Sequence, residues 1–126
     1  MRALIIDDSI SMRMYIAAMV ENMGAETAMA KDGQDALRIL EEQGQFDFAT
    51  VDWDMPVMDG PTFVQNVRAD SRYNGMKLVM LTAREGMNEV TRALSLGADD
   101  YLMKPVTADM IAEKMRLVGL RTGDNS

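Results

Sequence analysis

The sequence predicts an α/β protein with a five-stranded parallel sheet and helices on both faces. Two observations support this fold class. Short apolar runs alternate with amphipathic runs five times, and polar residues recur at corresponding places, where apolar runs end. Alternation at this spacing is typical of a doubly wound sheet joined by right-handed crossovers. The 126 residues suffice for one domain with a real core, and no linker, repeat or low-complexity stretch indicates a second domain.

The first strand–helix unit begins with the apolar run Leu4-Ile5-Ile6, which ends in Asp7-Asp8. Ser9 or Ser11 can cap the helix that follows, because their hydroxyl oxygens can accept from the first free N–H groups. The apolar positions of this helix recur at spacings of three and four: Met12, Ile16, Met19, Val20 and Met23. Gly24 is then expected to end it.

The second unit has the weaker signals. Residues Ala25–Ala30 form a short expected strand, and Asp32 can cap the next helix. That helix has Ala36, Leu37 and Leu40 on one face and Gly44 past its end.

The third unit is the most distinctive. The apolar strand Phe46–Val51 runs into Asp52, and Pro56 and Gly60 indicate a loop directly afterwards. Pro61 suits the first turn of a helix. Its inward positions are Phe63, Val64 and Val67.

The last two units complete the sheet. The fourth strand, Met76–Leu81, ends in Thr82-Ala83 and precedes a helix over Met87–Leu96. The fifth, Tyr101-Leu102-Met103, ends in Lys104-Pro105, and Thr107 can cap the final helix. The inward positions of these two helices are Val90, Ala93 and Leu94 in one and Ile111, Met115 and Val118 in the other. From Arg121 the chain is polar, and we expect it to fray.

Composition excludes several classes of function. The 20 acidic and 13 basic residues give a net charge of −7, which argues against nucleic acid or an anionic membrane as a partner. There is no Cys and no His, so disulfides, Cys or His metal sites, triads and phosphohistidine chemistry within the chain are excluded. Charges at Asp7 and Asp8 precede any run long enough for a signal peptide, and no later run reaches membrane length. The expected compartment is the cytoplasm.

The polar residues that follow the strands form a constellation. In a parallel sheet, Asp7, Asp8, Asp52, Thr82 and Lys104 would all lie at the carboxyl edge. Three carboxylates repel one another there, and a hard cation such as Mg²⁺ relieves that repulsion. Lys104 and the Thr82 hydroxyl can contact a phosphoryl group, and a carboxylate such as Asp52 can accept one. Taken singly, each residue is equally a helix cap or a solvated loop residue.

Four segments together resemble the receiver domains of two-component response regulators. They are Asp7-Asp8, the stretch Val-Asp-Trp-Asp-Met-Pro-Val-Met-Asp-Gly around Asp52, Thr82-Ala83 and Lys104-Pro105. The resemblance runs from about Arg2 to Val118 in order and spacing, and looks closest to the stand-alone chemotaxis type (CheY-like). It implies the strand order 2-1-3-4-5, a receiver domain over residues 1–120 and a polar tail over residues 121–126.

The resemblance also implies roles for individual residues. Asp52 would be the phosphoacceptor for a histidine kinase. Asp8 and Asp52 would bind Mg²⁺ directly, the backbone carbonyl of Asp54 would be a third ligand, and Asp7 would act through water. Lys104 would pair with the phosphoryl group and precede a cis bond to Pro105.

Two further sets of residues follow from the resemblance. Thr82 and Tyr101 would be a switch pair. Asp54, Ala83 and Arg84 occupy positions that vary in the family, so they either tune the phosphate lifetime or are loop residues without such a role. The output face would comprise the fourth helix, fifth strand and fifth helix, and would bind a downstream protein, in the chemotaxis case a flagellar motor switch component. We expect a monomer, and not an enzyme beyond slow self-dephosphorylation.

The main alternative is an enzyme, a phosphatase of the haloacid dehalogenase type. Asp52-Trp53-Asp54 resembles the Asp-x-Asp nucleophile motif of that family. Other parts of its site could be imitated by Thr82, Lys104 and Asp99-Asp100. However, the chain lacks a substrate cap, and Asp7-Asp8 would have no role. Turnover of a phosphomonoester would distinguish the two functions.

Two binding functions are disfavoured. A flavodoxin-like carrier needs a phosphate loop after the first strand, where two carboxylates would repel a flavin phosphate. An EF-hand over residues 52–60 fails because Pro56 occupies a ligand position.

Overall fold

The structure, a computed structural model, describes residues 1–83 and 87–119. Five parallel strands form one sheet in the order β2-β1-β3-β4-β5. The strands are β1 (Arg2–Ile6), β2 (Glu26–Ala30), β3 (Phe48–Asp52), β4 (Lys77–Thr82) and β5 (Asp100–Met103). The helices are α1 (Ile10–Asn22), α2 (Gly33–Gln43), α3 (Gly60–Arg68), the 3₁₀ turn η1 (Ser71–Tyr73), α4 (Met87–Leu96) and α5 (Ala108–Leu117). The predicted fold class and strand order are confirmed.

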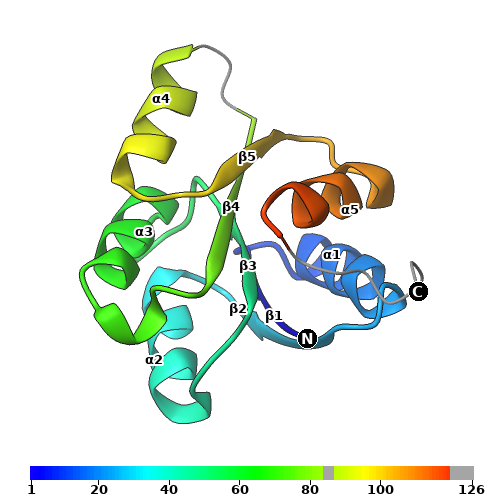
Figure 1. Ribbon diagram of the computed structural model, residues 1–126, viewed down its shortest axis with the longest axis horizontal. Coiled ribbons are helices and arrows are strands. Elements are labelled where there is room, and N and C mark those ends of the chain that lie inside the picture. The colour runs from blue at the N-terminus through cyan, green and yellow to red at the C-terminus, as the bar shows by residue number, and fades with distance from the viewer. Residues whose placement is uncertain (84–86, 120–126) are drawn as a thin grey trace.

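Helices cover both faces of the sheet (Figure 1). Helices α2, α3 and α4 pack on one face, where the core contains Leu4, Val51 and Met80. On the other face, α1 and α5 pack against residues such as Ile5 and Leu81. Successive strand residues point to opposite faces, and both faces are covered, so the central strands are apolar throughout.

The central and edge strands differ in burial. Every residue of β3 is buried, whereas only Ala30 is buried in β2 at the sheet edge. This difference explains why the sequence signal for β2 is weak, because an edge strand needs fewer apolar side chains.

Side-chain caps fix the starts of four helices. Ser9, not Ser11, is the N-cap of α1, and its hydroxyl accepts from the Met12 N–H at 3.3 Å. Asp32 and Thr107 cap α2 and α5 as predicted. Asp59 caps α3, where its carboxylate accepts from the Thr62 N–H. Because Asp59, Thr107 and Ser9 follow strand ends, the caps help to fix the loops at the carboxyl edge.

One inward position was wrong. Leu94 of α4 is 44% exposed, whereas Ala93 is buried and Val90 is half-buried. Leu94 is four residues from Val90 but adjacent to Ala93, and neighbouring helix residues point about 100° apart. Because Ala93 is the residue that points into the core, Leu94 lies at the flank of α4.

Some expectations fall outside the described residues. Arg84 and the tail over residues 121–126 are among them, so their predicted roles receive no structural account. Among the helices that are described, none is long and apolar enough to cross a membrane.

Candidate functional site

Three carboxylates meet at the carboxyl edge of the sheet, as the sequence predicted. Asp7 and Asp8 directly follow β1, and Asp52 is the last residue of β3. One oxygen from each lies within 4.8 Å of the others. Asp7 and Asp52 are buried, and Asp8 is exposed. Residues 45 positions apart in sequence are therefore brought together because β1 and β3 are parallel neighbours.

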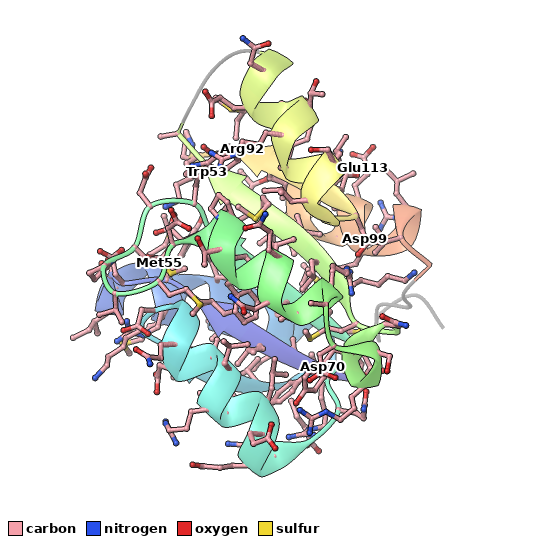
Figure 2. All side chains as sticks on the ribbon, turned by 90° about the vertical axis from the view of Figure 1, so that its left-hand side faces the viewer. Trp53, Met55, Asp70, Arg92, Asp99 and Glu113 are labelled. Carbon is pink, nitrogen blue, oxygen red and sulfur yellow. The ribbon has the colours of Figure 1, made fainter. Side chains whose placement is uncertain are left out.

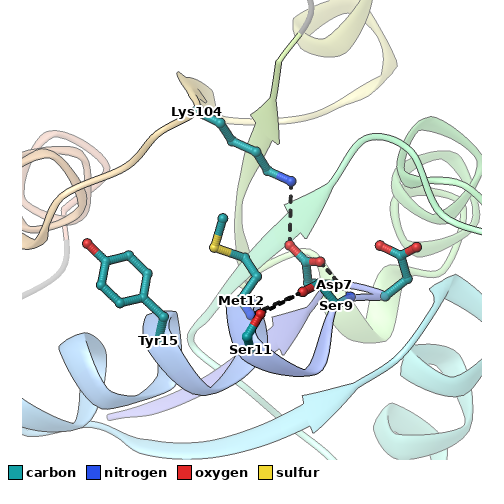
Figure 3. Close-up of a pocket in the computed structure, with 7 residues that line it drawn as sticks. Asp7, Ser9, Ser11, Met12, Tyr15 and Lys104 are labelled. Atoms are coloured by element: carbon teal, nitrogen blue, oxygen red, sulfur yellow. Dashed lines mark hydrogen bonds and ion pairs between the residues drawn. The ribbon is translucent and has the colours of Figure 1, made fainter.

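Lys104 joins this cluster from the end of β5. Its Nζ donates to Asp52 Oδ1 at 2.7 Å and lies 3.6 Å from Asp7 Oδ2. Figure 3 shows the Lys104 side chain reaching across the pocket to Asp7. The peptide bond between Lys104 and Pro105 is cis, as predicted. One cation thus contacts the two buried carboxylates, while Asp8 remains on the solvent side.

Burial and charge act in opposite directions at Asp52. Burial, assisted by the negative charges of Asp7 and Asp8, raises the pKa of Asp52 to about 6 against the lowering effect of Lys104. For Lys104, burial alone would lower the pKa, but the hydrogen bond to Asp52 and the charge of Asp7 raise it. Asp52 is therefore mostly ionised near neutral pH, although its charge is poorly solvated.

Asp7 is fixed on one side and lacks a hydrogen bond on the other. Its Oδ1 accepts from the Ser9 N–H at 2.9 Å, and its backbone carbonyl accepts from Arg13 at 2.7 Å. Its Oδ2 is buried and, among the described residues, has no hydrogen bond and only the longer contact with Lys104. A buried carboxylate oxygen in this condition suits a cation or its bound water. The donor set of three carboxylates therefore fits a hard divalent ion.

The loop between β3 and α3 begins directly after Asp52. Trp53 is buried, and Asp54 is exposed in this loop. The Gly60 N–H donates to the Trp53 carbonyl at 3.0 Å, so the loop closes on itself at its base. Asp54 thus lies near Asp52 because it is only two residues further along the chain, at the start of this loop.

The expected switch residues lie on neighbouring strands. Thr82 ends β4 and is buried, and Ala83 follows it as an exposed small residue. Tyr101 of β5 is half-buried and pairs in register with Met80. Because Met80 and Thr82 are two residues apart, Thr82 and Tyr101 point to the same face of the sheet.

A pocket of about 420 Å³ opens beside Asp7 and Asp8. It is lined by Asp7, Asp8, Ser9, Ser11, Met12, Tyr15 and Lys104 (Figure 3). The sequence prediction did not assign Ser9, Ser11, Met12 and Tyr15 to the site. Their position was a usable signal, because a helix that starts directly after Asp8 places its first two turns beside the carboxylates. Tyr15 also donates from its hydroxyl to the Val106 carbonyl at 3.2 Å, which connects α1 to the segment after Lys104.

Comparisons with known proteins agree with this geometry. Residues 3–116 match the model of the response regulator receiver domain. The chain is 37% identical over 119 residues to the chemotaxis protein CheY of Pseudomonas aeruginosa, which covers 94% of this chain and 95% of that protein. It is 35% identical over 125 residues to the chemotaxis protein CheY1 of Helicobacter pylori, covering 98% and 100% of the two chains.

Solved structures give the same result. The structure of CheY4 of Vibrio cholerae superposes with a TM-score of 0.86 at 32% identity, covering 93% of this chain and 97% of that one. A CheY-like receiver domain protein of Methanospirillum hungatei superposes with a TM-score of 0.81 at 29% identity, covering 92% and 90%.

These matches span almost the whole length of the chain and give no support to the phosphatase alternative. Receiver domains are signalling proteins rather than classical enzymes: they take phosphate from histidine kinases and act on downstream targets. The chain belongs to the response regulator receiver family, and is a phosphorylation-dependent signalling switch of the CheY type.

Proposed function

We propose that this receiver accepts a phosphoryl group from a histidine kinase on Asp52, with Mg²⁺ as cofactor. The observation that carries this proposal is the buried Asp52 carboxylate, which lies in a three-carboxylate cluster and 2.7 Å from Lys104. Asp7 and Asp52 are both buried, whereas Asp8 is exposed on the outer side of the cluster. Of the two buried carboxylates, Asp52 is the one that ends a fully buried strand and accepts the hydrogen bond from Lys104.

The residues that would hold Mg²⁺ are Asp8 and Asp52 directly, the Asp54 backbone carbonyl, and Asp7 through water. When bound, the ion supplies positive charge that offsets the carboxylates and the phosphoryl oxygens. Asp52 acts as the nucleophile: its carboxylate oxygen forms the new bond to phosphorus. The bond between phosphorus and the donor nitrogen breaks, and the donor histidine keeps that electron pair. No proton is required from this chain.

Lys104 has a different task before and after transfer. In the unphosphorylated protein its ammonium group is paired with Asp52. After transfer the negative charge lies on the phosphoryl oxygens, and the Lys104 stem can place its charge against one of them. The Thr82 hydroxyl, on the adjacent strand end, can donate to another. Both residues therefore respond to the product rather than to the donor.

The remaining assignments concern output and lifetime. We propose Thr82 and Tyr101 as the switch pair, and the surface of α4, β5 and α5 as the face that binds a downstream target. The named relatives are chemotaxis proteins, so a flagellar motor switch component is the first target to test. We also propose that the protein is a monomer and acts in the cytoplasm. Asp54 and Ala83 flank the site and would tune slow self-dephosphorylation, as would Arg84, which lies outside the described residues. The receiver would comprise residues 1–120.

The acceptor assignment is tested by treating the protein with a small acyl phosphate and Mg²⁺ and recording intact mass. One phosphoryl group is expected on the wild-type protein and none on Asp52→Asn, which keeps the shape of the side chain and removes the nucleophile. Lys104→Ala should still bind Mg²⁺ and yet be labelled slowly. Equal labelling of Asp52→Asn and the wild type would contradict the assignment.

A further inference from the structure

The loop between β3 and α3 has a strained backbone. Val57 adopts a φ of 68° and is 76% exposed, so its side chain gains little from packing. A β-branched residue in this left-handed region is disfavoured, and such a conformation persists only where the surroundings hold it. Figure 2 shows the loop, with Met55 labelled, on the same side of the molecule as α2 and α3. Contacts made by the loop must therefore supply the restraint.

Met58, the residue after Val57, makes those contacts. Its N–H donates to the Pro56 carbonyl at 2.7 Å, which closes a tight turn around Val57. Its carbonyl accepts from the Gly33 N–H at 3.1 Å. Gly33 is the first residue of α2, so its N–H has no partner within the helix. The start of α2 thus holds the tip of a loop that begins next to Asp52.

The site leaves no room for a side chain at Gly33. A Cβ there would lie 2.8 Å from Met58 Cγ and 2.9 Å from the Met58 carbonyl oxygen. The close approach of the two backbones is therefore possible only because residue 33 lacks a side chain. Gly60, which directly follows the loop, has the same property, because an added Cβ there would contact the Asp52 carbonyl. Two glycines thus allow close backbone approaches, Gly33 to Met58 and Gly60 to the start of the loop.

We propose that Gly33 is a positioning residue of the phosphoryl-acceptor site. By holding Met58, it keeps the strained loop in the conformation that places the Asp54 backbone beside Asp8 and Asp52. This inference rests on the proposed function, because it concerns the same site. Gly33 itself touches no reacting atom, and it acts through Met58 and the loop backbone.

The proposal is tested by Gly33→Ala, with Gly75→Ala as the matched control. Gly75 has nothing within 4 Å of an added Cβ and no left-handed φ, so the same substitution there has open space. Mg²⁺ titrations of the unphosphorylated proteins, followed by Trp53 fluorescence, give the dissociation constants. We expect Gly33→Ala to weaken Mg²⁺ binding about tenfold, as loss of a group that orients a metal site does. Gly75→Ala should stay within about twofold of the wild type.

A rescue experiment separates positioning from general destabilisation. Met58→Ala in the Gly33→Ala background removes the Cγ and Sδ atoms that the new methyl group would meet, leaving only the carbonyl contact. Compared with Met58→Ala alone, the double variant should lose much less than tenfold in Mg²⁺ affinity. Amide spectra of the metal-free proteins should show Gly33→Ala shifts concentrated in residues 53–60. Ala forms helices better than Gly, so the shifts should not arise from unfolding of α2.

Unchanged Mg²⁺ affinity in Gly33→Ala would overturn the proposal. So would an equal loss in the presence and absence of the Met58→Ala change, because the effect would then not pass through the Met58 side chain that fills the space beside Gly33. These titrations use no phosphodonor, and they stand whether or not Asp52 is the acceptor. Failure of Asp52 labelling would overturn the proposed function, whereas failure of the titration contrast would overturn only the role of Gly33.

Discussion

Helices α3 and α4 cover the same face of the sheet but are held differently. In α3, five of nine residues are buried: Gly60, Pro61, Phe63, Val64 and Val67. In α4, Ala93 is the one buried side chain among residues 88–96. Buried apolar area is the main source of packing stability. The helix that follows the acceptor loop is therefore fixed more firmly than the helix on the proposed output face.

Arg68 connects the two helices. From the end of α3, its guanidinium donates to the carbonyls of Gly97 at 2.8 Å, Tyr73 at 3.1 Å and Met76 at 2.8 Å. It also pairs with Asp99 at 2.9 Å. Gly97 directly follows α4, so that end of α4 is fixed to α3. We therefore expect α3 to hold the proposed acceptor site in place, and α4 to adjust between its fixed end and the proposed switch residues.

The largest expected difference between the helices is in stability. Phe63 is fully buried in α3, so Phe63→Ala should lower the free energy of unfolding by about 3–5 kcal/mol. Leu94→Ala in α4 should cost less than about 1 kcal/mol, because that side chain is 44% exposed. Urea denaturation at constant pH gives both values. Comparable losses in the two variants would show that α4 is as firmly packed as α3, and would remove the basis of the comparison.

The second effect concerns Asp52, the proposed acceptor, whose burial in the charged form opposes folding. The pKa of Asp52 is about 6 in the folded protein, against an ordinary value of 3.8. Because the folded state binds the proton more tightly, this group favours folding below about pH 4, and that contribution is lost as the pH rises through about 6. Without metal at pH 7.5, Asp52→Asn should therefore be more stable than the wild type by about 1–3 kcal/mol.

The gain in Asp52→Asn should shrink as the pH falls and disappear near pH 4. Differences between the urea midpoints of the two proteins, measured at several pH values, cancel the titration of carboxylates distant from Asp52, so the remaining pH dependence belongs to Asp52 and the groups coupled to it. A constant difference in stability across this pH range would mean that the pKa of Asp52 is not raised in the folded protein.

The residues that sequence reasoning identified share a property. Asp7, Asp52, Thr82 and Lys104 are each placed by the strand that precedes them, so a local pattern and the rule for parallel sheets suffice. Asp32 and Thr107 were recognised as caps for a similar reason, since capping depends on a few adjacent residues.

The features that were missed depend on contacts distant in sequence. The role of Gly33 depends on Met58, which is 25 positions away. Val57 has a left-handed backbone although it is not a glycine, so its residue type did not indicate this conformation. The exposure of Leu94 depends on the angle at which α4 meets the sheet. Tyr15 joins the site because α5 and the segment at Val106 lie beside α1. Such positions are set by tertiary packing rather than by local preference.

The third effect is metal binding at the carboxylate cluster, which lies next to the loop that leads into α3. With few protein ligands, Mg²⁺ should bind with a dissociation constant near about 1 mM, so 10 mM Mg²⁺ should stabilise the wild type by about 1.4 kcal/mol. Asp8→Ala should lose most of this gain, because Asp8 belongs to the carboxylate cluster and is one of the two proposed direct carboxylate ligands. Leu94→Ala should keep the full gain if the site depends on the α3 side alone. Thermal unfolding with and without Mg²⁺ measures all three, and an unchanged gain in Asp8→Ala would contradict the ligand assignment.

The smallest expected effect concerns the switch side. Lys114 of α5 lies 3.2 Å from Asp100 and 5.8 Å from the centre of the Tyr101 ring. Contacts of this kind at partly exposed positions are worth on the order of 0.5–1 kcal/mol. Lys114→Met should therefore alter the balance of Tyr101 positions by a few-fold at most, without affecting the labelling of Asp52. A large loss of labelling would mean that α5 supports the acceptor site itself.

Amide spectra before and after phosphorylation test where the signal goes. A new anionic group at Asp52 attracts Thr82 and Lys104, and movement of Thr82 toward it would vacate space on the face of the sheet that Tyr101 shares. Because a modification shifts an equilibrium only by its differential stabilisation of two states, the response should be graded. Shifts should appear over residues 88–96 and around Tyr101, and be larger in Lys114→Met if that contact restrains the ring. Residues 60–68 should change little, because five of the nine residues of α3 are buried. If α3 shifts as much as α4, the signal spreads through the whole face, and the weaker packing of α4 does not direct it.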